Sequence, residues 1–546
     1  MIAPNALIYG DNLDVLRRHI ADESVDLVYL DPPFNSNANY NVLFGGKGGS
    51  QSAAQVQAFA DTWHWDDVAA RAYQETVEAG GGAAEALRAF KQLIGRNGGD
   101  MMAYLAMMAP RLVELRRVLK PTGSIYLHCD PTASHYLKVL MDAVFGPMQF
   151  RNEIIWKRSS AHSDARMKLG DVTDVILFYA RGEKAIWNAP RRSLSDANVA
   201  QKYGSIDEAG RRYTTRDLRS PSPRPNLTYE YRGFQPHPNG WSISREKMEQ
   251  YDREGRLWMP TKADGRIRLK IYLDESTGQP LQNLWDDIPP INSRAAERLG
   301  YPTQKPLALL ERIIEASSNP GGVVLDPFCG CGTTVHAAQQ LGRRWIGIDI
   351  THLAIGLMRT RLRDAFGPAA EFKVYGEPTT AEDAAALADL DKYQFQFWAL
   401  GLVGARPASS DERKGADGGI DGRLYFHDEG TGGASKQIIL SVKGGKTDVT
   451  HVRDLVGVLD RERAQIGVLI SLQEPTKPMR QEAANAGFYR SPWDGRDYAR
   501  IQLLTVAELL DGRGIQMPAP SILNTTFQRA QRSAPDSGAQ PTLPGT

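Results

Sequence analysis

A strand, a glycine-rich loop and a helix start, followed by a second strand that carries an acid, constrain the fold of this chain most. An apolar run at 323–325 leads into the loop Asp326-Pro327-Phe328-Cys329-Gly330-Cys331-Gly332-Thr333-Thr334, and a second run at 345–350 contains Asp349. Doubly wound α/β folds bind nucleotide-like cofactors with this order of elements, the acid facing the ribose hydroxyls. The loop is neither G-x-G-x-x-G nor Gly-Lys-Ser/Thr, which disfavours a pyrophosphate or triphosphate ligand.

A second loop follows an earlier apolar strand. Residues 25–30 are predicted to form a buried strand, and Asp31-Pro32-Pro33-Phe34 comes directly after them. Because proline lacks a backbone N–H, the loop offers carbonyl oxygens and the Asp31 carboxylate beside an aromatic ring. An exocyclic amino group can donate to Asp31 and to the Pro32 carbonyl while its base stacks on Phe34. The loop is therefore predicted to hold the amino group of a flat base; an ordinary proline-rich turn is the alternative.

The two loops together resemble those of DNA amino-methyltransferases of the circularly permuted beta class, which use S-adenosylmethionine. In that family the D-P-P-F/Y loop precedes the target-recognition region and the D-P-F-x-G-x-G-T loop follows it, as in this chain. The resemblance covers most of residues 1–368. It implies an α/β fold, namely a doubly wound Rossmann-like methyltransferase domain with an inserted target-recognition region.

The resemblance also implies roles for individual residues. Asp31, Pro32, Pro33 and Phe34 are expected to hold a base flipped out of DNA. The residues expected to bind the cofactor are Asp11, Lys305, Asp326, Phe328, Gly330, Gly332, Thr333 and Asp349. Within this set Asp326 is expected to face the methionine amino group, Asp349 the ribose and Asp11 the adenine. Lys305 belongs to the segment 301–306, which closes over the methionine end in the family.

The chain is predicted to divide into six parts. They are 1–150, the N-terminal part of the catalytic domain with an insertion at about 46–99; 151–295, the target-recognition region; 296–368, the cofactor-binding part; 369–392, a linker; 393–530, an endonuclease-type domain; and 531–546, a disordered tail. A chain of 546 residues is long enough for more than one globular domain.

Positive charge is concentrated in the predicted recognition region. The whole chain has a net charge of +1, but residues 151–270 hold 24 Lys and Arg against 15 Asp and Glu. The arginines expected to contact phosphates are Arg191, Arg192, Arg211, Arg212, Arg216, Arg219 and Arg224. This excess favours double-stranded DNA as the partner, with a solvated surface as the alternative.

Composition excludes several other classes. The chain has no long uncharged apolar run and no opening apolar segment with basic flanks, so we expect no membrane span and a cytoplasmic location. Its three cysteines, Cys129, Cys329 and Cys331, cannot form a disulfide framework, and no C-x-x-C pair is available for zinc.

Beyond about residue 370 a separate alternation of strands and helices follows, as a smaller α/β domain. Asp421 precedes a strand at 423–426, and a second strand ends at Lys443. This order is similar to that of Mrr-like restriction endonucleases of the PD-D/E-x-K group, in which acids bind a divalent metal and a lysine orients the attacking water. The resemblance implies Asp421 as a ligand of Mg²⁺ and Lys443 as the catalytic lysine.

The endonuclease pattern is incomplete. Two residues before the lysine, where that group has Glu, Asp or Gln, this chain has Ser441, which is a poor metal ligand. Asp454 or Asp460 on the following helix could supply the missing ligand. The alternative is a catalytically silent domain that holds DNA or a protein partner.

The sequence therefore predicts a DNA methyltransferase of restriction-modification or DNA modification that methylates N6 of adenine. N4 of cytosine as the target, and a bifunctional enzyme that also cleaves DNA, remain as alternatives, as does a methyltransferase part that serves recognition alone. Protein glutamine methylation is disfavoured, because that related group carries Asn-Pro-Pro-Tyr after its cofactor loop. Resemblance to the beta class leaves a homodimer as an open alternative.

Overall fold

The computed structural model describes most of the chain. The described residues are 2–33, 65–95, 99–159, 169–262, 265–292, 295, 297–299, 301, 303–408, 419–426, 428 and 435–518. Phe34, the start of the predicted insertion up to residue 64 and the predicted tail lie outside them. The chain forms two compact units, residues 1–188 with 283–546 and residues 189–282, and each is described by itself below.

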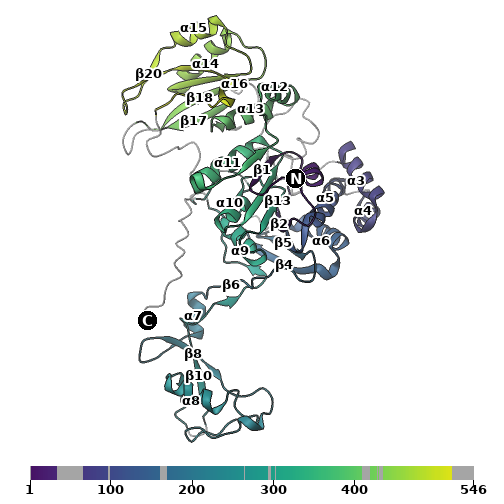
Figure 1. The fold of residues 1–546 in the computed structure, drawn as a ribbon, viewed down its shortest axis with the longest axis vertical. Coiled ribbons are helices and arrows are strands. Elements are labelled where there is room, and N and C mark those ends of the chain that lie inside the picture. The colour runs from purple at the N-terminus through teal and green to yellow at the C-terminus, as the bar shows by residue number, and fades with distance from the viewer. Residues whose placement is uncertain are drawn as a thin grey trace. The chain divides into compact units, whose positions relative to one another are not determined.

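The first unit is built on a nine-stranded sheet (Figure 1). Its strands are β1 (Ala6–Tyr9), β2 (Val25–Leu30), β3 (Leu119–Cys129), β4 (Phe150–Lys157), β5 (Thr173–Ala180), β12 (Leu284–Trp285), β13 (Val323–Asp326), β14 (Arg344–Asp349) and β15 (Lys373–Tyr375). They lie in the order β12-β4-β5-β3-β2-β13-β14-β1-β15. The strands from β3 to β15 run parallel, and β5 is antiparallel to both of its neighbours.

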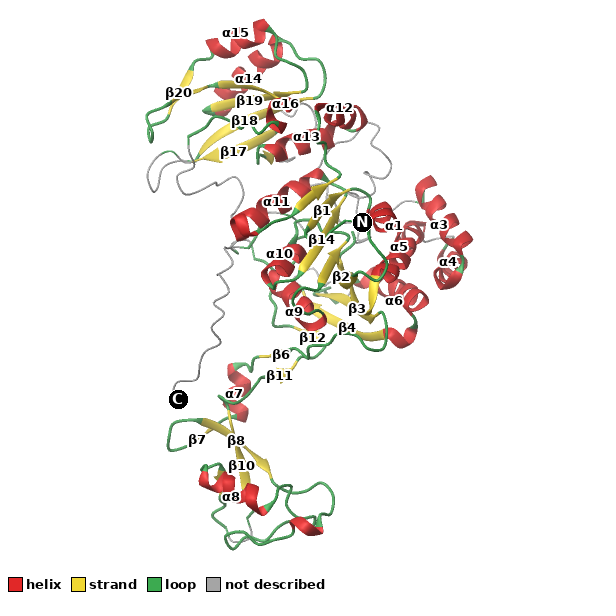
Figure 2. Cartoon of the chain, viewed as in Figure 1, coloured by secondary structure: helices red, strands yellow, loops and turns green. Residues whose placement is uncertain are grey.

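Helices cover both faces of this sheet, as Figure 2 shows. One face is covered by α1 (Asn12–His19), α5 (Gly99–Val118) and α6 (Pro131–Phe145), with α3 (Asp67–Ala79) and α4 (Gly81–Ile94) packed outside them. The other face is covered by α9 (Leu307–Ser317), α10 (Thr333–Gln340) and α11 (His352–Phe366). The central strands are apolar along most of their length because both of their faces are buried. The predicted doubly wound α/β fold is confirmed.

The segment 151–295, predicted as the recognition region, is divided between the two units. Strands β4 and β5 belong to the main sheet, so the separate unit begins at residue 189 and ends at 282. It contains the sheet β7-β8-β10-β9 and a small core around Trp241, Met248 and Leu269. Its elements are β6 (Arg191–Arg192), α7 (Asp196–Lys202), β7 (Ser205–Ile206), β8 (Arg212–Asp217), α8 (Arg245–Arg253), β9 (Leu257–Trp258), β10 (Arg268–Tyr272) and β11 (Gln279–Pro280).

The segment predicted as a linker, 369–392, is ordered. Strand β15 extends the main sheet by pairing with β1. Helix α12 (Ala381–Leu390) then buries Ala384 and Ala388 in the core of the C-terminal domain. Its alanine-rich, acidic sequence did not indicate this, because small apolar side chains can pack closely without a strong hydrophobic period.

The C-terminal domain has its own sheet in the order β16-β17-β18-β19-β22. These strands are β16 (Arg406–Pro407), β17 (Gly422–Phe426), β18 (Lys436–Lys443), β19 (Ile466–Ser471) and β22 (Ile501–Thr505). One face packs on α12, α13 (Lys392–Leu402) and α16 (Val506–Leu510), and the other on α14 (Val449–Glu462) and α15 (Lys477–Asn485). A two-stranded ribbon, β20 (Phe488–Arg490) with β21 (Asp497–Ala499), completes the domain. No helix within the described ranges is long and apolar enough to cross a membrane.

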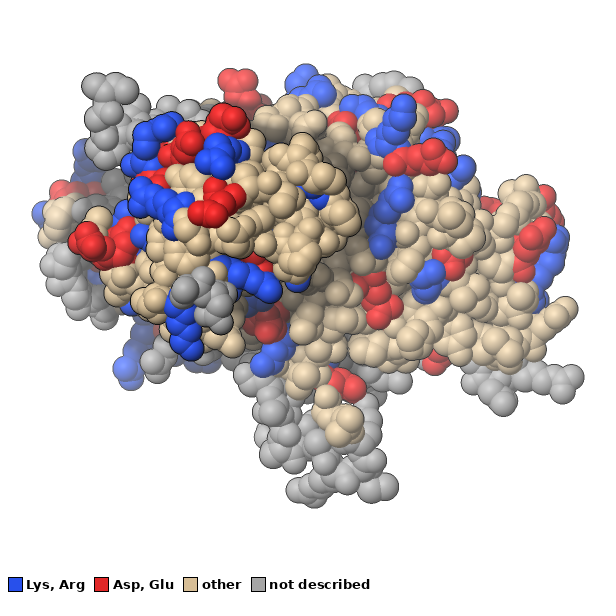
Figure 3. Space-filling view, turned by 90° about the horizontal axis from the view of Figure 1, so that it is seen from below, with Lys and Arg blue, Asp and Glu red and all other residues tan. Residues whose placement is uncertain are grey.

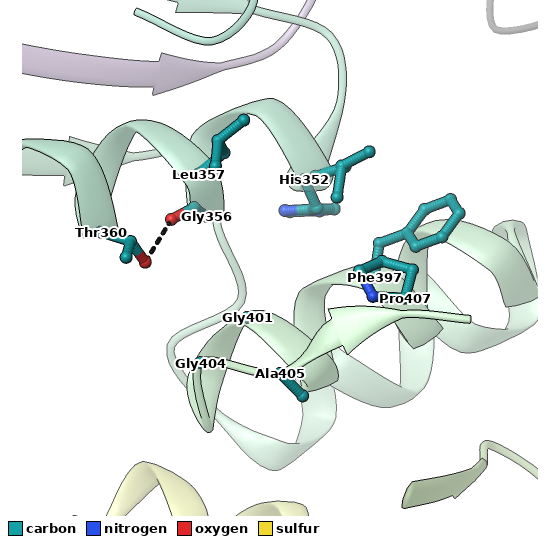
Figure 4. Close-up of a pocket in the computed structure, with 10 residues that line it drawn as sticks. His352, Gly356, Leu357, Thr360, Phe397, Gly401, Gly404, Ala405 and Pro407 are labelled. Carbon is teal, nitrogen blue, oxygen red and sulfur yellow. Dashed lines mark hydrogen bonds between the residues drawn. The ribbon is translucent and has the colours of Figure 1, made fainter. Parts of the chain in front are cut away.

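Helix α13 of this domain packs against α11, which covers the main sheet. The contact is close because Gly356 and Gly401 face each other: a Cβ atom on Gly356 would lie 3.7 Å from the Gly401 Cα. A pocket beside the contact is lined by both helices and by the residues that follow α13 (Figure 4). The side chain of Gln394 also accepts a hydrogen bond from the His352 N–H at the start of α11. The C-terminal domain is thus attached next to the strand that carries Asp349.

Candidate active site

Three predicted site acids meet at one edge of the main sheet. Asp31 follows β2, Asp326 ends β13 and Asp349 ends β14. Because these strands are parallel neighbours, their carboxyl ends lie at the same edge, where open α/β sheets bind their ligands. The topology therefore brings together Asp31 and Asp326, which are far apart in the sequence.

The glycine-rich loop after β13 has a backbone that suits glycine at two positions. Gly330 and Gly332 have φ angles of 52° and 77°, a region that other residues seldom adopt. A Cβ on Gly332 would lie 2.6 Å from the Met358 Cγ, and one on Gly330 would lie 3.3 Å from the ring of Tyr301. The loop thus turns tightly into α10, with Tyr301 and Met358 packed closely against its glycines.

Two buried carboxylates flank this loop. Asp326, 3% exposed, accepts hydrogen bonds from the Phe328 N–H at 3.0 Å and the Thr334 hydroxyl at 2.5 Å. Burial raises the pKa of Asp326 to about 7 despite these bonds. Asp349 accepts from the Gly330 N–H at 2.9 Å and from Thr351, and burial raises its pKa to about 6. A buried acid whose pKa lies near neutral pH can bind a cation or hydroxyl groups. The methionine amine and the ribose of S-adenosylmethionine would provide these groups.

Asp11 lies at the start of α1 and has structural partners. Its side chain caps the helix by accepting from the Leu13 and Asp14 N–H groups, and it forms an ion pair with Arg111 at 3.0 Å. Its neighbour Asn12 donates to the Pro327 carbonyl at 2.7 Å and accepts from Arg111 at 2.6 Å. The Gly10-Asp11-Asn12 segment is therefore joined to the glycine-rich loop, with the Asp11 side chain 40% exposed.

The side chains of Thr333 and Phe328 have different surroundings. The Thr333 hydroxyl accepts a hydrogen bond at 3.0 Å from Arg361, whose buried guanidinium also donates to the Cys331 carbonyl. The Thr333 side chain thus supports the loop from its inner side. Phe328 packs against the hydrophobic core. At these two positions the loop therefore presents mainly backbone atoms at the sheet edge.

Asp31 is joined to Lys305 by an ion pair. The Lys305 Nζ lies 2.5 Å from the Asp31 Oδ2, and the two side chains are 12% and 15% exposed. Pro32 is buried and Pro33 half-buried beside them, while Phe34 lies outside the described residues. Lys305 was predicted at the cofactor, but its ion pair is with the residue predicted to hold the base.

Four buried polar residues near these loops were missed at the sequence level: Arg111, His128, Asp174 and Arg361. His128 and Asp174 lie in apolar strand segments, where a lone polar residue was the available signal. Arg111 and Arg361 lie in helices with other charged residues, so the sequence did not single them out. His128 bridges the Tyr29 hydroxyl at 2.9 Å and the Asp174 carboxylate at 3.0 Å. The three residues come from the neighbouring strands β2, β3 and β5.

The arginines of residues 189–282 that were predicted to contact phosphates differ in their surroundings. Arg211 forms a bidentate pair with Asp274 and stacks on Tyr272 at 3.7 Å, and Arg191 donates to the Thr277 and Gly278 carbonyls. The side chains of Arg212, Arg216, Arg219 and Arg224 are exposed. The face drawn in Figure 3 carries basic and acidic side chains interspersed. Some of the positive side chains in this segment are therefore paired or hydrogen-bonded within the protein.

The described residues of the endonuclease-type site do not form a set of ligands for a magnesium ion. The Asp421 Oδ2 accepts from the Val442 N–H at 2.6 Å and from the Ser441 hydroxyl at 3.1 Å, and lies 3.8 Å from the Lys443 Nζ. Asp460, a proposed additional ligand, pairs with Arg500 at 2.8 Å. Across the described part of the chain no group of three His, Cys, Asp or Glu is placed to bind a metal. Asp421 and Lys443 are close, but the described residues around them do not supply the expected metal ligands.

A sheet edge that combines acids for a nucleoside cofactor with an Asp-Pro-Pro loop for an amino group is that of a Rossmann-like amino-methyltransferase. Residues 25–357, more than half of the chain, match the family described as DNA methylase, N6_N4_Mtase. The chain belongs to this DNA methylase family. The predictions of a DNA methyltransferase that uses S-adenosylmethionine, and of a methyltransferase fold, are confirmed.

Relatives with assigned names agree with this family. The chain is 29% identical over 376 residues to the type II methyltransferase M.EcaI of Enterobacter cloacae, covering 68% of this chain and 72% of that protein. It is 28% identical over 353 residues to the StyLTI Mod subunit, a type III restriction-modification protein of Salmonella typhimurium, covering 62% and 50%. It is 25% identical over 355 residues to the DNA adenine methyltransferase YhdJ of Escherichia coli, covering 65% and 81%.

Among solved structures, the chain is similar to TTHA0409 of Thermus thermophilus in complex with S-adenosyl-L-methionine, with 16% identity, a TM-score of 0.33, and coverage of 69% of this chain and 100% of that one. The C-terminal residues 405–511 match a second family, described as NACHT-associated inactive Restriction Endonuclease 1. The prediction of a restriction-endonuclease-like domain is confirmed, and the description of that family as inactive agrees with the incomplete set of metal ligands.

Proposed function

We propose that this methyltransferase acts on N6 of adenine in double-stranded DNA and that Asp31 and the Pro32 carbonyl orient the amino group. The observation that carries this proposal is the placement of the Asp31 loop beside Asp326 at one sheet edge. With the amine donating two hydrogen bonds, its lone pair is held toward the methyl donor. Similarity to the adenine enzyme YhdJ supports adenine over cytosine.

The residues proposed to hold S-adenosylmethionine are Asp326 for its amino group, Asp349 for its ribose and the glycine-rich loop at Gly330 and Gly332. The cofactor supplies an electrophilic methyl group on a sulfonium, so the reaction needs no metal or nucleophilic side chain. As the nitrogen–carbon bond forms, the carbon–sulfur electrons go to sulfur, and the nitrogen then releases a proton. The protein's part is to exclude water and align the two groups.

Asp11 is proposed to approach the adenine of the cofactor from its capping position, and Phe34 to stack on the target base. Exposed arginines of the recognition unit, such as Arg216 and Arg219, are proposed to contact DNA phosphates. A cytoplasmic location and a homodimer complete the proposal: the first follows from a DNA substrate and the second from the resemblance to the beta class.

The C-terminal domain is proposed to be a catalytically silent module that holds DNA or a protein partner. Its Asp421 carboxylate already accepts hydrogen bonds from Val442 and Ser441. An ionised carboxylate used in this way stabilises the strand, and a divalent ion would need further oxygen ligands beside it.

The test is transfer of labelled methyl from S-adenosylmethionine to DNA of mixed sequence, followed by digestion to nucleosides. We expect label on N6-methyladenine, a loss of about 10³-fold in turnover for Asp31→Ala, and unchanged cofactor affinity in that variant. Asp497→Ala, which breaks an exposed ion pair with Arg490 in the C-terminal domain, is the matched control. Label on N4-methylcytosine would reassign the base, and normal turnover of Asp31→Ala would overturn the assignment.

A further inference from the structure

The ion pair between Lys305 and Asp31 joins two segments that the sequence separates by 274 positions. Both side chains are largely buried, with exposures of 12% and 15%, so water screens the pair little. Lys305 contacts Oδ2, one of two carboxylate oxygens. A carboxylate held by one oxygen in this way has restricted rotation, and the other oxygen has a defined direction.

Lys305 also interacts electrostatically with a second acid, Asp174. Burial alone would raise the pKa of Asp174, but the hydrogen bond from His128 and the charges of Lys305 and Arg158 lower it. The Arg158 Nε lies 3.3 Å from the Asp174 Oδ1. Asp174 is therefore a fixed negative charge near the Lys305 ammonium, on the side of the buried strands.

The Asp174 carboxylate is held by a buried relay of three residues. Because an ionised carboxylate can accept but not donate, the His128 Nε2 carries the proton that bonds Asp174. The His128 Nδ1 lies 2.9 Å from the Tyr29 hydroxyl, on the other side of the ring. Burial raises the pKa of Tyr29, which keeps this phenol protonated. His128 is fully buried, and Asp174 is 2% exposed.

We propose that Lys305 is a positioning residue for the target base: it fixes the Asp31 carboxylate through Oδ2, so that Oδ1 is presented to the amino group. The buried Asp174 is a second negative charge that acts on the same ammonium. This inference rests on the proposed function, and it moves Lys305 from the cofactor to the acceptor side of the site. The relay accounts for the tyrosine, the histidine and the aspartate that interrupt these three apolar strands.

The test separates turnover from cofactor binding. Lys305→Met keeps the length of the side chain and removes its charge, and we expect kcat to fall at least tenfold while the Kd for S-adenosylmethionine, by calorimetry, stays within twofold. Lys305→Arg restores a cation and is expected to recover part of kcat. Asp174→Asn, which keeps the side-chain shape, is expected to lower kcat by a smaller factor with the same Kd.

Three outcomes overturn the inference. They are a Lys305→Met variant with normal kcat, a variant whose Kd for the cofactor rises tenfold while kcat at saturation is unchanged, and no recovery with arginine. The wild-type enzyme is measured in the same assay; absence of methyl transfer by the wild-type protein would refute the proposed function, whereas the outcomes above refute the role of Lys305 alone. A folded state is verified for each variant by its thermal unfolding.

Discussion

The Asn12 side-chain amide donates a hydrogen bond to the Pro327 carbonyl at 2.7 Å, across 315 positions of sequence. Asn12 begins α1, next to the first strand, and Pro327 lies in the glycine-rich loop after β13. In a circularly permuted order these two segments come from opposite ends of the catalytic domain. This single bond, with Arg111 behind it at 2.6 Å from the Asn12 Oδ1, fixes the loop relative to the start of the chain.

Asn12→Ala is expected to destabilise the protein by about 1–3 kcal/mol, because it leaves the Pro327 carbonyl without its donor and removes one acceptor of the buried Arg111, which keeps its pair with Asp11. It is also expected to weaken S-adenosylmethionine binding, since the loop loses its anchor. Chemical denaturation and calorimetry measure the two effects. Asn198→Ala, on the exposed side of α7, is the control and should change stability by less than about 0.5 kcal/mol. Equal stability of the two variants would contradict the anchoring role.

Cofactor binding is expected to depend on pH through Asp326. Its pKa of about 7 means that the acid is protonated in the free protein below neutrality, whereas a bound ammonium requires the ionised form. The Kd should therefore rise as pH falls from 7 to 5, by up to about tenfold per unit, and binding should release a proton. Calorimetry in two buffers of different ionisation enthalpy measures this release.

The same raised pKa has the opposite sign for the stability of the free protein. A carboxyl whose pKa is higher in the folded state stabilises the fold below its unfolded value of about 4, and this stabilisation is lost as pH rises through 7. Asp326→Asn should remove both pH dependences and weaken cofactor binding. A Kd that stays constant between pH 5 and 8 in the wild-type protein would show that Asp326 does not meet a cation.

Gly332→Ala is expected to destabilise the protein by about 1–3 kcal/mol and to weaken cofactor binding. The alanine would have to adopt a φ of 77°, and its Cβ would lie 2.6 Å from the Met358 Cγ. Gly457→Ala is the matched control, because Gly457 lies within α14 with no atom near its added Cβ. That change should be neutral or should stabilise by up to about 1 kcal/mol. Thermal unfolding measures the change in stability of both variants.

The C-terminal domain is expected to show no metal-dependent cleavage of DNA. Plasmid incubated with the protein and Mg²⁺ or Mn²⁺ should remain supercoiled, and Lys443→Ala should behave as the wild-type protein does. The reason is that Asp421 is used by Ser441 and Val442, so a divalent ion would have too few carboxylate ligands. Cleavage that requires the metal and disappears in Lys443→Ala would instead establish a bifunctional enzyme.

The domain boundaries are the part of the fold that the sequence predicted least well. The apolar runs that form β2, β13 and β14 were recognisable because strands buried on both faces are continuously apolar. Strands β4 and β5 were assigned to the recognition region, and α12 to a linker, because membership of a sheet or core depends on long-range partners. A stretch such as 381–390 has the same composition in a linker as in a packed helix.

The sequence by itself determined the family, the α/β class and the two loops that carry the chemistry, because these depend on short segments whose residue types are dictated by local geometry: glycine where φ is positive, proline where donors are absent, and acids at strand ends. The tertiary structure alone decided the partners of those residues. It paired Asp31 with Lys305, joined Asn12 to Pro327 and placed His128 between Tyr29 and Asp174, because each contact forms between segments that only the ordering of the strands brings together.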